Sequence, residues 1–230
     1  MHPTAKEPPP TAPQYYFAYG SNLSLKQMAS RCPDSFYAGR AVLPDYRWQI
    51  NQRGFANVVP CSGSSVHGLV YQVYPEDEAR LDTHEGVSSG AYSKEYEFIM
   101  LYPAAPDLHV PTQQLVGDGL SRALERARSS GSTQDSCAAV SALVYTSMSY
   151  VQEDSPREEY VGRMNTGILD ARRLGVPAEF FENVVRLRIP DRPILRSSTR
   201  SGSKGCDGRL SALFKTLKPK ESGRKMVPSF

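Results

Sequence analysis

Short runs of apolar residues, separated by glycine, proline and polar stretches, predict β-strands along most of the chain. The first run, Tyr15-Tyr16-Phe17-Ala18-Tyr19, is rich in aromatic residues and is typical of a buried strand. The same β-forming composition predicts five more strands, at residues 40–50, 54–60, 66–74, 92–102 and 138–146. The pattern therefore predicts about six strands, with 66–74 as a central one.

Capping signals predict helices between these strands. Ser24-Leu25-Lys26-Gln27 has the Ser-x-x-Gln pattern of a capping box, which opens a helix. Pro75 suits the first turn of a second helix, and Gly86 is a natural C-terminal residue, so that helix should end near Glu85. A second capping box, Ser155-Pro156-Arg157-Glu158, predicts a later helix that opens there.

Composition divides the chain into three parts. Residues 1–14 are proline-rich and are expected to be disordered, and residues 15–190 are expected to form one domain. Within that domain the strand pattern dissolves over 103–137, which we interpret as an insertion that is partly helical at 115–128. Residues 191–230 hold ten Lys/Arg and three Asp/Glu, so this tail carries +7 and is expected to be largely disordered, whereas the remainder carries −4.

Several classes of protein are disfavoured by what the residues lack. Cys32, Cys61, Cys137 and Cys206 lie far apart without nearby histidines, so neither a metal site nor a disulfide framework is expected. No apolar run approaches membrane-spanning length, and the N-terminus lacks the apolar core of a signal peptide, so we expect no membrane contact and a cytoplasmic location. The basic tail has one aromatic residue in its body, Phe214, and no recognised nucleic-acid-binding fold, which argues against a nucleic-acid partner.

The junction between the first strand and the first helix is the candidate site. A strand, a glycine turn and a helix start leave the backbone N–H groups of Gly20, Ser21, Asn22 and Leu23 directed at one spot. Such a spot suits a carboxylate or a developing oxyanion. The alternative is an ordinary strand-to-helix turn, in which Gly20 supplies backbone freedom and the polar residues are caps.

Two separated motifs resemble the gamma-glutamylcyclotransferase family. The first is Phe17-Ala18-Tyr19-Gly20-Ser21-Asn22-Leu23, and the second is Leu81-Asp82-Thr83-His84-Glu85-Gly86-Val87, followed by Ser89-Gly90-Ala91-Tyr92. The resemblance implies an α+β fold, a small mixed β-barrel of about six strands with flanking helices. The residue pattern agrees with the strand number but does not distinguish a barrel from an open sheet.

The resemblance also implies an enzyme of the lyase or acyltransferase type, active in glutathione metabolism and needing no cofactor. The reaction would cyclise a gamma-glutamyl amino acid to 5-oxoproline and release the amino acid. Glu85 matches the catalytic acid/base of the family. Its place at the negative end of a helix, together with burial, would raise its pKa toward that of a working base. The alternative is a solvated glutamate at a helix end.

The resemblance further implies substrate contacts along the first motif and at two later tyrosines, any of which could instead be core residues. These candidates, with the backbone N–H groups of the turn, are Tyr16, Phe17, Ala18, Tyr19, Gly20, Ser21, Asn22, Leu23, Tyr145 and Tyr160. The expected partner is a small gamma-glutamyl molecule, and a homodimer is left open. Two alternatives remain: a relative specific for glutathione or gamma-glutamyl amines, and a non-catalytic binding module of the same fold. Glu85 is the feature that argues for an enzyme.

Overall fold

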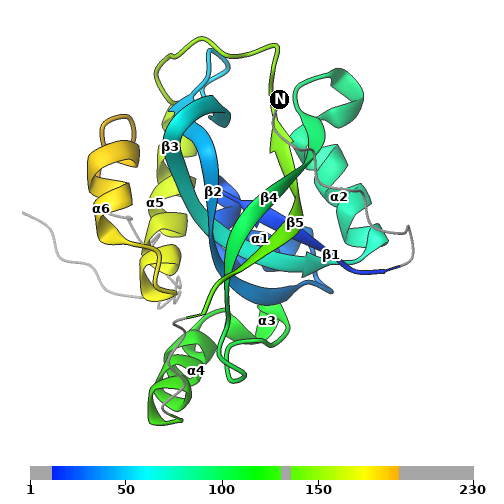
Figure 1. The fold of residues 1–230 in the computed structure, drawn as a ribbon, viewed down its shortest axis with the longest axis vertical. Helices are drawn as coiled ribbons and strands as arrows, with labels where there is room; N and C mark the ends of the chain where they lie inside the picture. Colours follow the sequence, from blue (N-terminus) through cyan, green and yellow to red (C-terminus); the bar gives the residue numbers. More distant parts are fainter. Residues whose placement is uncertain (1–11, 131–135, 192–230) are drawn as a thin grey trace, which may run out of the picture. The chain divides into compact units, whose positions relative to one another are not determined.

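The computed structural model describes residues 12–130 and 136–191. Five β-strands form its framework, and helices connect them or pack around them (Figure 1). The strands are β1 (Gln14–Ala18), β2 (Phe36–Ile50), β3 (Ala56–Val73), β4 (Ser93–Pro103) and β5 (Ala138–Thr146). The α-helices are α1 (Leu25–Arg31), α2 (Pro75–Glu85), α3 (Thr112–Leu115), α4 (Asp118–Ser129), α5 (Glu158–Arg173) and α6 (Ala178–Phe180). Three further single turns are η1 (Ser21–Leu23), η2 (Val87–Ser89) and η3 (Phe181–Val185).

The strands close into a mixed barrel in the order β1-β3-β2-β4-β5. Neighbouring strands are antiparallel except β1 and β5, which run parallel and close the barrel where Tyr16 pairs with Leu143. In Figure 1, α5 and α6 cover one side of the barrel and α2 covers the other. The α+β barrel expected from the family resemblance is therefore confirmed.

The barrel has five strands where about six were predicted, because residues 56–73 form one strand. The polar stretch after Pro60 predicts a break between two strands, but backbone pairing with β2 continues on both sides of it. The register shifts there, opposite Asp45, whose φ of 59° is the only positive value among the described non-glycine residues. The Asp45 carboxylate accepts a hydrogen bond from the Gly63 backbone N–H at 2.8 Å. A bulge thus replaces the predicted loop, and the long hairpin stays continuous.

Three predicted helix boundaries are confirmed. Ser24 caps α1, since its hydroxyl accepts from the Gln27 backbone N–H at 3.4 Å. The second helix begins at Pro75 and ends at Glu85, and Gly86 follows it in the left-handed conformation with φ 68°. This conformation is the one that a glycine adopts at little steric cost. All three boundaries depend on contacts within one turn of helix, which is why local sequence signals predicted them.

The predicted capping box at Ser155 is wrong. The helix α5 begins three residues later, at Glu158, and Arg157 precedes it without a side-chain cap. The segment before it is instead tied to the β2–β3 hairpin. The Asp154 backbone N–H donates to the Ile50 carbonyl at 3.0 Å, and the Arg157 backbone N–H donates to the Gly54 carbonyl at 3.1 Å. Tertiary pairing therefore holds these residues extended where the local pattern favoured helix.

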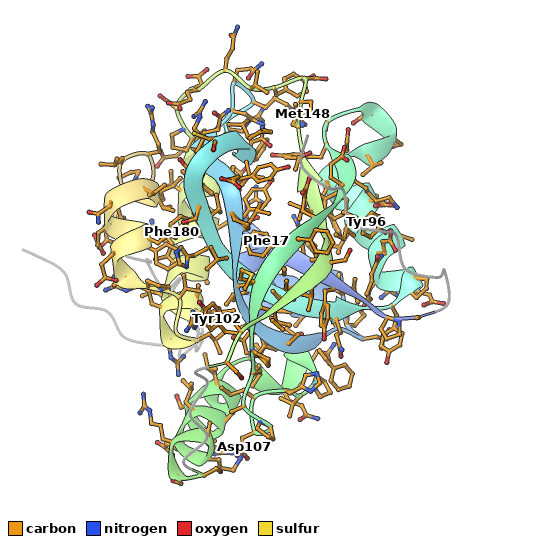
Figure 2. The ribbon with its side chains drawn as sticks, viewed as in Figure 1. Phe17, Tyr96, Tyr102, Asp107, Met148 and Phe180 are labelled. Carbon is orange, nitrogen blue, oxygen red and sulfur yellow. The ribbon has the colours of Figure 1, made fainter. Side chains whose placement is uncertain are left out.

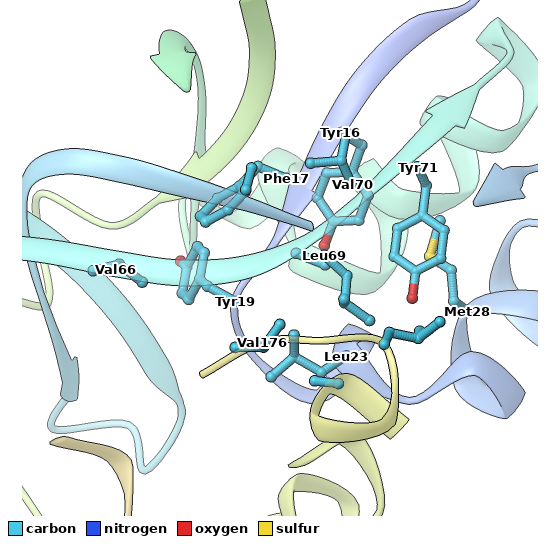
Figure 3. Close-up of a cluster of buried hydrophobic side chains, with 14 of the residues drawn as sticks. Tyr16, Phe17, Tyr19, Leu23, Met28, Val66, Leu69, Val70, Tyr71 and Val176 are labelled. Carbon is cyan, nitrogen blue, oxygen red and sulfur yellow. The ribbon is translucent and has the colours of Figure 1, made fainter. Parts of the chain in front are cut away.

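The core lies inside the barrel and between the barrel and its helices. Phe17 is fully buried at the centre of the barrel, whereas Met148 lies at the periphery and is 61% exposed (Figure 2). Figure 3 shows Leu69 and Val70 of β3 among the buried side chains around β1. Because both faces of β1 are covered, its sequence is a continuous apolar run and not an alternating one.

The remaining predictions concern the ends of the chain and the insertion. The predicted disorder of the N-terminus and of the basic tail falls almost entirely on residues 1–11 and 192–230, which lie outside the described residues. Within 103–137 the structure has α3 and α4, so the predicted partial helix is present at Asp118–Ser129. None of the described helices is both long and apolar enough to cross a membrane.

Candidate active site

A cavity of about 190 Å³ opens where β1 gives way to η1. This volume is smaller than the roughly 300–1,000 Å³ of drug-sized pockets, so the cavity suits a fragment of amino-acid size. Its walls come from most elements of the barrel and from α5. The lining residues are Tyr16, Tyr19, Gly20, Ser21, Asn22, Arg31, Arg53, Phe55, Ala56, His84, Glu85, Tyr92, Tyr145, Tyr160 and Arg163.

The turn at Gly20 forms one wall and leaves little room for a side chain there. Gly20 has φ −114°, so the requirement is not a left-handed backbone. A Cβ at this position would lie 2.9 Å from the Tyr160 hydroxyl and 3.4 Å from the Ala56 Cβ. Of the backbone N–H groups predicted to face the site, that of Leu23 is already used, because it donates to the Gly20 carbonyl at 3.0 Å. Close approach, and not backbone strain, explains the glycine.

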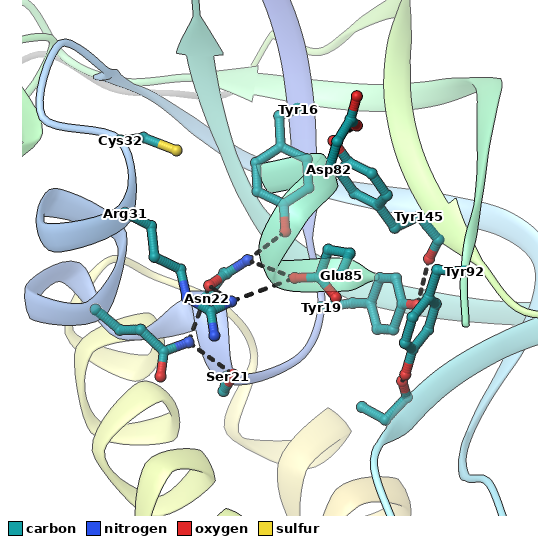
Figure 4. A network of polar contacts seen from close by, with 12 residues as sticks. Tyr16, Tyr19, Ser21, Asn22, Arg31, Cys32, Asp82, Glu85, Tyr92 and Tyr145 are labelled. Atoms are coloured by element: carbon teal, nitrogen blue, oxygen red, sulfur yellow. Dashed lines mark hydrogen bonds and ion pairs between the residues drawn. The ribbon is translucent and has the colours of Figure 1, made fainter. Parts of the chain in front are cut away.

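The Glu85 carboxylate reaches the cavity from the last residue of α2. Its side chain is 19% exposed, and Oε1 accepts from the Asn22 amide and from the Arg31 guanidinium, each at 3.3 Å (Figure 4). Gly86 ends the helix directly after it, which turns the chain away from the site. Burial raises the pKa of Glu85 above its usual value, while Arg31 and Asn22 oppose that rise.

The Asn22 side chain connects the Gly20 turn to Glu85 by hydrogen bonds. Its amide nitrogen donates to the Tyr16 hydroxyl at 2.7 Å as well as to Glu85. Its amide oxygen accepts from Gln27 at 2.9 Å and from Arg31 at 3.0 Å. Both donors lie on the same face of α1, four residues apart, so one helix face orients the amide. The Gln27 side chain thus stabilises the turn at Gly20 and does not cap the start of α1.

Cationic side chains outnumber carboxylates around the cavity. Arg31, Arg53 and Arg163 line it together with one carboxylate, that of Glu85. The Nη1 atom of Arg53 is buried and has no hydrogen-bond partner among the described residues. A buried guanidinium nitrogen without an acceptor is costly, and an anion bound in the cavity would satisfy it. The site is therefore built to hold a negatively charged group beside Glu85.

Four tyrosine hydroxyls around the cavity are fixed by protein groups. The Tyr19 hydroxyl donates to the Tyr145 carbonyl. The Tyr145 hydroxyl donates to Asp82 at 2.7 Å, and that of Tyr92 donates to the Ala56 carbonyl at 2.7 Å. Tyr160 differs, because its hydroxyl accepts from the Ala56 backbone N–H at 3.3 Å and keeps its own proton for another acceptor. Burial raises the pKa of Tyr160 to about 12, so it stays a donor at neutral pH.

The structure brings most of the predicted residues together. Those that line the cavity are Tyr16, Tyr19, Gly20, Ser21, Asn22, Glu85, Tyr145 and Tyr160. The side chains of Phe17, Ala18 and Leu23 are fully buried in the core and do not line it. Leu23 packs where α5 approaches the turn, since a Cβ on Gly167 would lie 2.9 Å from the Leu23 Cβ. That close approach positions Tyr160 on the same helix.

The sequence reasoning missed several residues of the cavity, among them three arginines and Tyr92. Arg31 had a signal, because it lies one helical turn after Gln27 on the face that meets the site. Arg163 likewise follows Tyr160 by three residues on α5. Tyr92 belongs to the second motif, but no role was assigned to it. Arg53 sits in the β2–β3 turn, and no local pattern marks it.

Within the described residues, no group of three or more His, Cys, Asp or Glu side chains is placed to hold a metal ion. The cavity combines one proton-accepting carboxylate, a tyrosine donor and cationic groups for an anion. These parts can bind a small anionic molecule and move a proton on and off it.

Comparison with known proteins finds a family to which part of the chain is similar. Residues 16–106 match the family model described as gamma-glutamyl cyclotransferase, AIG2-like. The curated gamma-glutamylcyclotransferases of Mus musculus and Bos taurus are 32% and 31% identical to it over 87 residues. Each alignment covers 34% of this chain and 46% of the relative, so the chain matches less than half the length of these proteins.

Solved structures show the same fold. A gamma-glutamyl cyclotransferase superposes with a TM-score of 0.55 at 20% identity, covering 74% of this chain and 85% of that one. YkqA from Bacillus subtilis gives a TM-score of 0.52 at 19% identity, covering 76% of this chain and 54% of that one. The matched segment contains both the Gly20 turn and Glu85. Through residues 16–106, the chain is similar to the gamma-glutamyl cyclotransferase, AIG2-like family.

Proposed function

We propose that this protein is a gamma-glutamylcyclotransferase that converts gamma-glutamyl amino acids to 5-oxoproline and the free amino acid, with Glu85 as general acid/base. The observation that carries the proposal is the position of the Glu85 carboxylate, which lies in a cavity of amino-acid size opposite the Gly20 turn. The match of residues 16–106 to the family model and the names of the matched relatives support the reaction class.

The reaction needs little beyond folding the substrate and moving protons. The substrate α-amine attacks its own γ-carbonyl carbon, which forms the lactam N–C bond and then breaks the bond to the departing nitrogen. The attacking ammonium gives up two protons in all, and the departing nitrogen gains two. Glu85 can accept each proton from the first nitrogen and deliver it to the second, so the carboxylate returns to its starting state. Both reacting groups belong to one molecule, so positioning replaces an external nucleophile.

The remaining cavity groups support binding and charge stabilisation in this scheme. The partnerless Nη1 of Arg53 supplies a donor for the substrate α-carboxylate. The Tyr160 hydroxyl, held next to Gly20 and by the Ala56 N–H, can donate to the oxygen that becomes negative during attack. Because its pKa is raised, Glu85 is a stronger base near neutral pH than a glutamate with the usual pKa.

The test is direct. The full chain is incubated with gamma-glutamyl amino acids, glutathione and gamma-glutamyl amines, and 5-oxoproline is quantified by mass spectrometry. We expect 5-oxoproline from the gamma-glutamyl amino acids, and a loss of product on Glu85→Gln. Folded protein that forms no 5-oxoproline from any of these compounds would overturn the proposal and favour a binding module of the same fold. Product from glutathione or the amines alone would instead favour the more specialised enzymes.

A further inference from the structure

A groove of about 420 Å³ adjoins the cavity between α1 and α5. It is lined by Ser24, Lys26, Gln27, Ser30, Arg31, His84, Arg163 and Thr166. Three of these residues, Arg31, His84 and Arg163, also line the cavity, so the two spaces share a wall. A molecule that is too long for the cavity would therefore extend into the groove.

The lining of the groove is polar and one-sided in charge. Lys26, Arg31 and Arg163 are basic, and the other side chains are hydroxyls, an amide and an imidazole. No Asp or Glu is found among these described lining residues. Burial and the nearby Arg31 lower the pKa of His84, so at neutral pH it adds hydrogen bonding and little charge. The groove therefore favours an anionic group over a neutral or cationic one.

The two arginines are partly engaged, and the lysine is not. Arg31 pairs with Glu85. Arg163 donates from Nε and Nη2 to Glu159 at 3.0 and 3.1 Å, a pairing that does not use Nη1 of the same guanidinium. Lys26 is exposed and makes no ion pair with any described residue. Lys26 and Arg163 thus have donors available for one carboxylate.

We propose that this groove binds the departing half of a gamma-glutamyl substrate through its carboxylate, and that Lys26 and Arg163 determine this specificity. The inference rests on the proposed function. The glutamyl half occupies the cavity beside Glu85, and the bond to be broken lies near the shared wall. The departing amino acid or peptide then lies in the groove. A gamma-glutamyl amine has no carboxylate to offer and leaves both cations without an anion.

Two substrates that differ only in this carboxylate provide the test. Gamma-glutamyl-alanine and gamma-glutamyl-ethylamide have the same reacting groups, and the second lacks only the carboxylate of the departing part. For the full-length protein we expect kcat/KM to be about tenfold or more higher for gamma-glutamyl-alanine, the factor of one charge-assisted hydrogen bond. The preference should shrink as ionic strength rises, because Lys26 is exposed.

Variants assign the preference to residues. Lys26→Gln and Arg163→Gln should each lower kcat/KM for gamma-glutamyl-alanine, and the double variant should bring the two substrates within about twofold. The ethylamide is an internal control, because damage to Glu85 or to the fold would lower both substrates together. Arg172→Gln is the matched control, since Arg172 lies on the same helix, lines neither space and pairs with Glu182.

The outcomes separate this inference from the function on which it rests. Equal kcat/KM for the two substrates in the unaltered protein would overturn the groove assignment and leave the cyclotransferase reaction intact. A preference that survives in the double variant would also overturn the assignment to Lys26 and Arg163. Absence of 5-oxoproline from both substrates would overturn the proposed function and this inference with it.

Discussion

Replacing Glu85 by glutamine should lower the activity of the protein and raise its stability. Glutamine keeps the size of the side chain and an oxygen that can accept from Asn22 and Arg31, but it cannot take a proton at neutral pH. The loss expected for removing a general acid/base is about 10²- to 10⁴-fold in kcat. Substrate affinity should change little, because the proposed carboxylate contacts belong to Arg53 and the turn.

The stability effect follows from the pKa of Glu85. Because the pKa is raised in the folded protein, folding favours the protonated carboxyl, and that stabilisation is lost as pH rises through the folded pKa. At neutral pH the free energy of unfolding of the wild-type protein is therefore lower by about 1.4 kcal/mol for each unit by which folding raises the pKa of Glu85. Glutamine resembles the protonated carboxyl, so the variant does not carry this penalty. A chain of this size gains about 2–4 °C in Tm per kcal/mol.

The assay measures kcat, ligand affinity and Tm on the same preparations. The Tm advantage of Glu85→Gln should be largest near pH 7 and should vanish below the usual glutamate range, where the wild-type carboxyl is protonated too. Glu76→Gln is a suitable control, because Glu76 is exposed on the same helix and lines neither space. Near-normal turnover in Glu85→Gln would remove Glu85 from the mechanism. A lower Tm at neutral pH would show that the Arg31 pair outweighs the cost of burial.

Three further outcomes are expected. Arg31→Gln removes a charge that lowers the pKa of Glu85, so the acid limb of the kcat/KM profile should move to higher pH while the plateau persists; an unmoved limb would contradict this. Gly20→Val should reduce kcat/KM more than Tm, because its side chain would displace the Tyr160 hydroxyl from the cavity wall, and normal kinetics would refute that role. A chain of residues 12–191 should keep the turnover of the full chain, since every cavity-lining residue lies within it; a folded but inactive product would show that the removed ends contribute.

Part of the candidate site could be predicted from the sequence because each of its two motifs consists of neighbouring residues. The strand, the Gly20 turn and the cap at Ser24 depend on residues within a few positions of one another. The same holds for the helix that starts at Pro75 and ends at Glu85 before Gly86. Such boundaries are set by backbone sterics and by hydrogen bonds within one turn. These boundaries therefore do not depend on contacts between segments distant in sequence.

Other predictions failed where tertiary pairing opposed a local signal. The polar stretch after Pro60 looks like a loop, yet β3 pairs with β2 on both sides of it, at Pro60 and at Ser65, so the hairpin continues. Ser155 has the pattern of a helix cap, yet hydrogen bonds from Asp154 and Arg157 to the β2–β3 hairpin hold the chain extended. In both places, backbone pairing between segments distant in sequence outweighs the local pattern.

The sequence by itself predicted most of the strands and three helix boundaries, because each depends on neighbouring residues. The choice of Glu85 as the candidate base came from the resemblance of its motif to a known family. Only the tertiary structure decided that the sheet closes, through the parallel pairing of Tyr16 with Leu143. It also decided that Arg31, Arg53 and Arg163, from three separate segments, surround one carboxylate. Closure and this arrangement of charge depend on contacts between segments far apart in the chain. No spacing within any one segment encodes them.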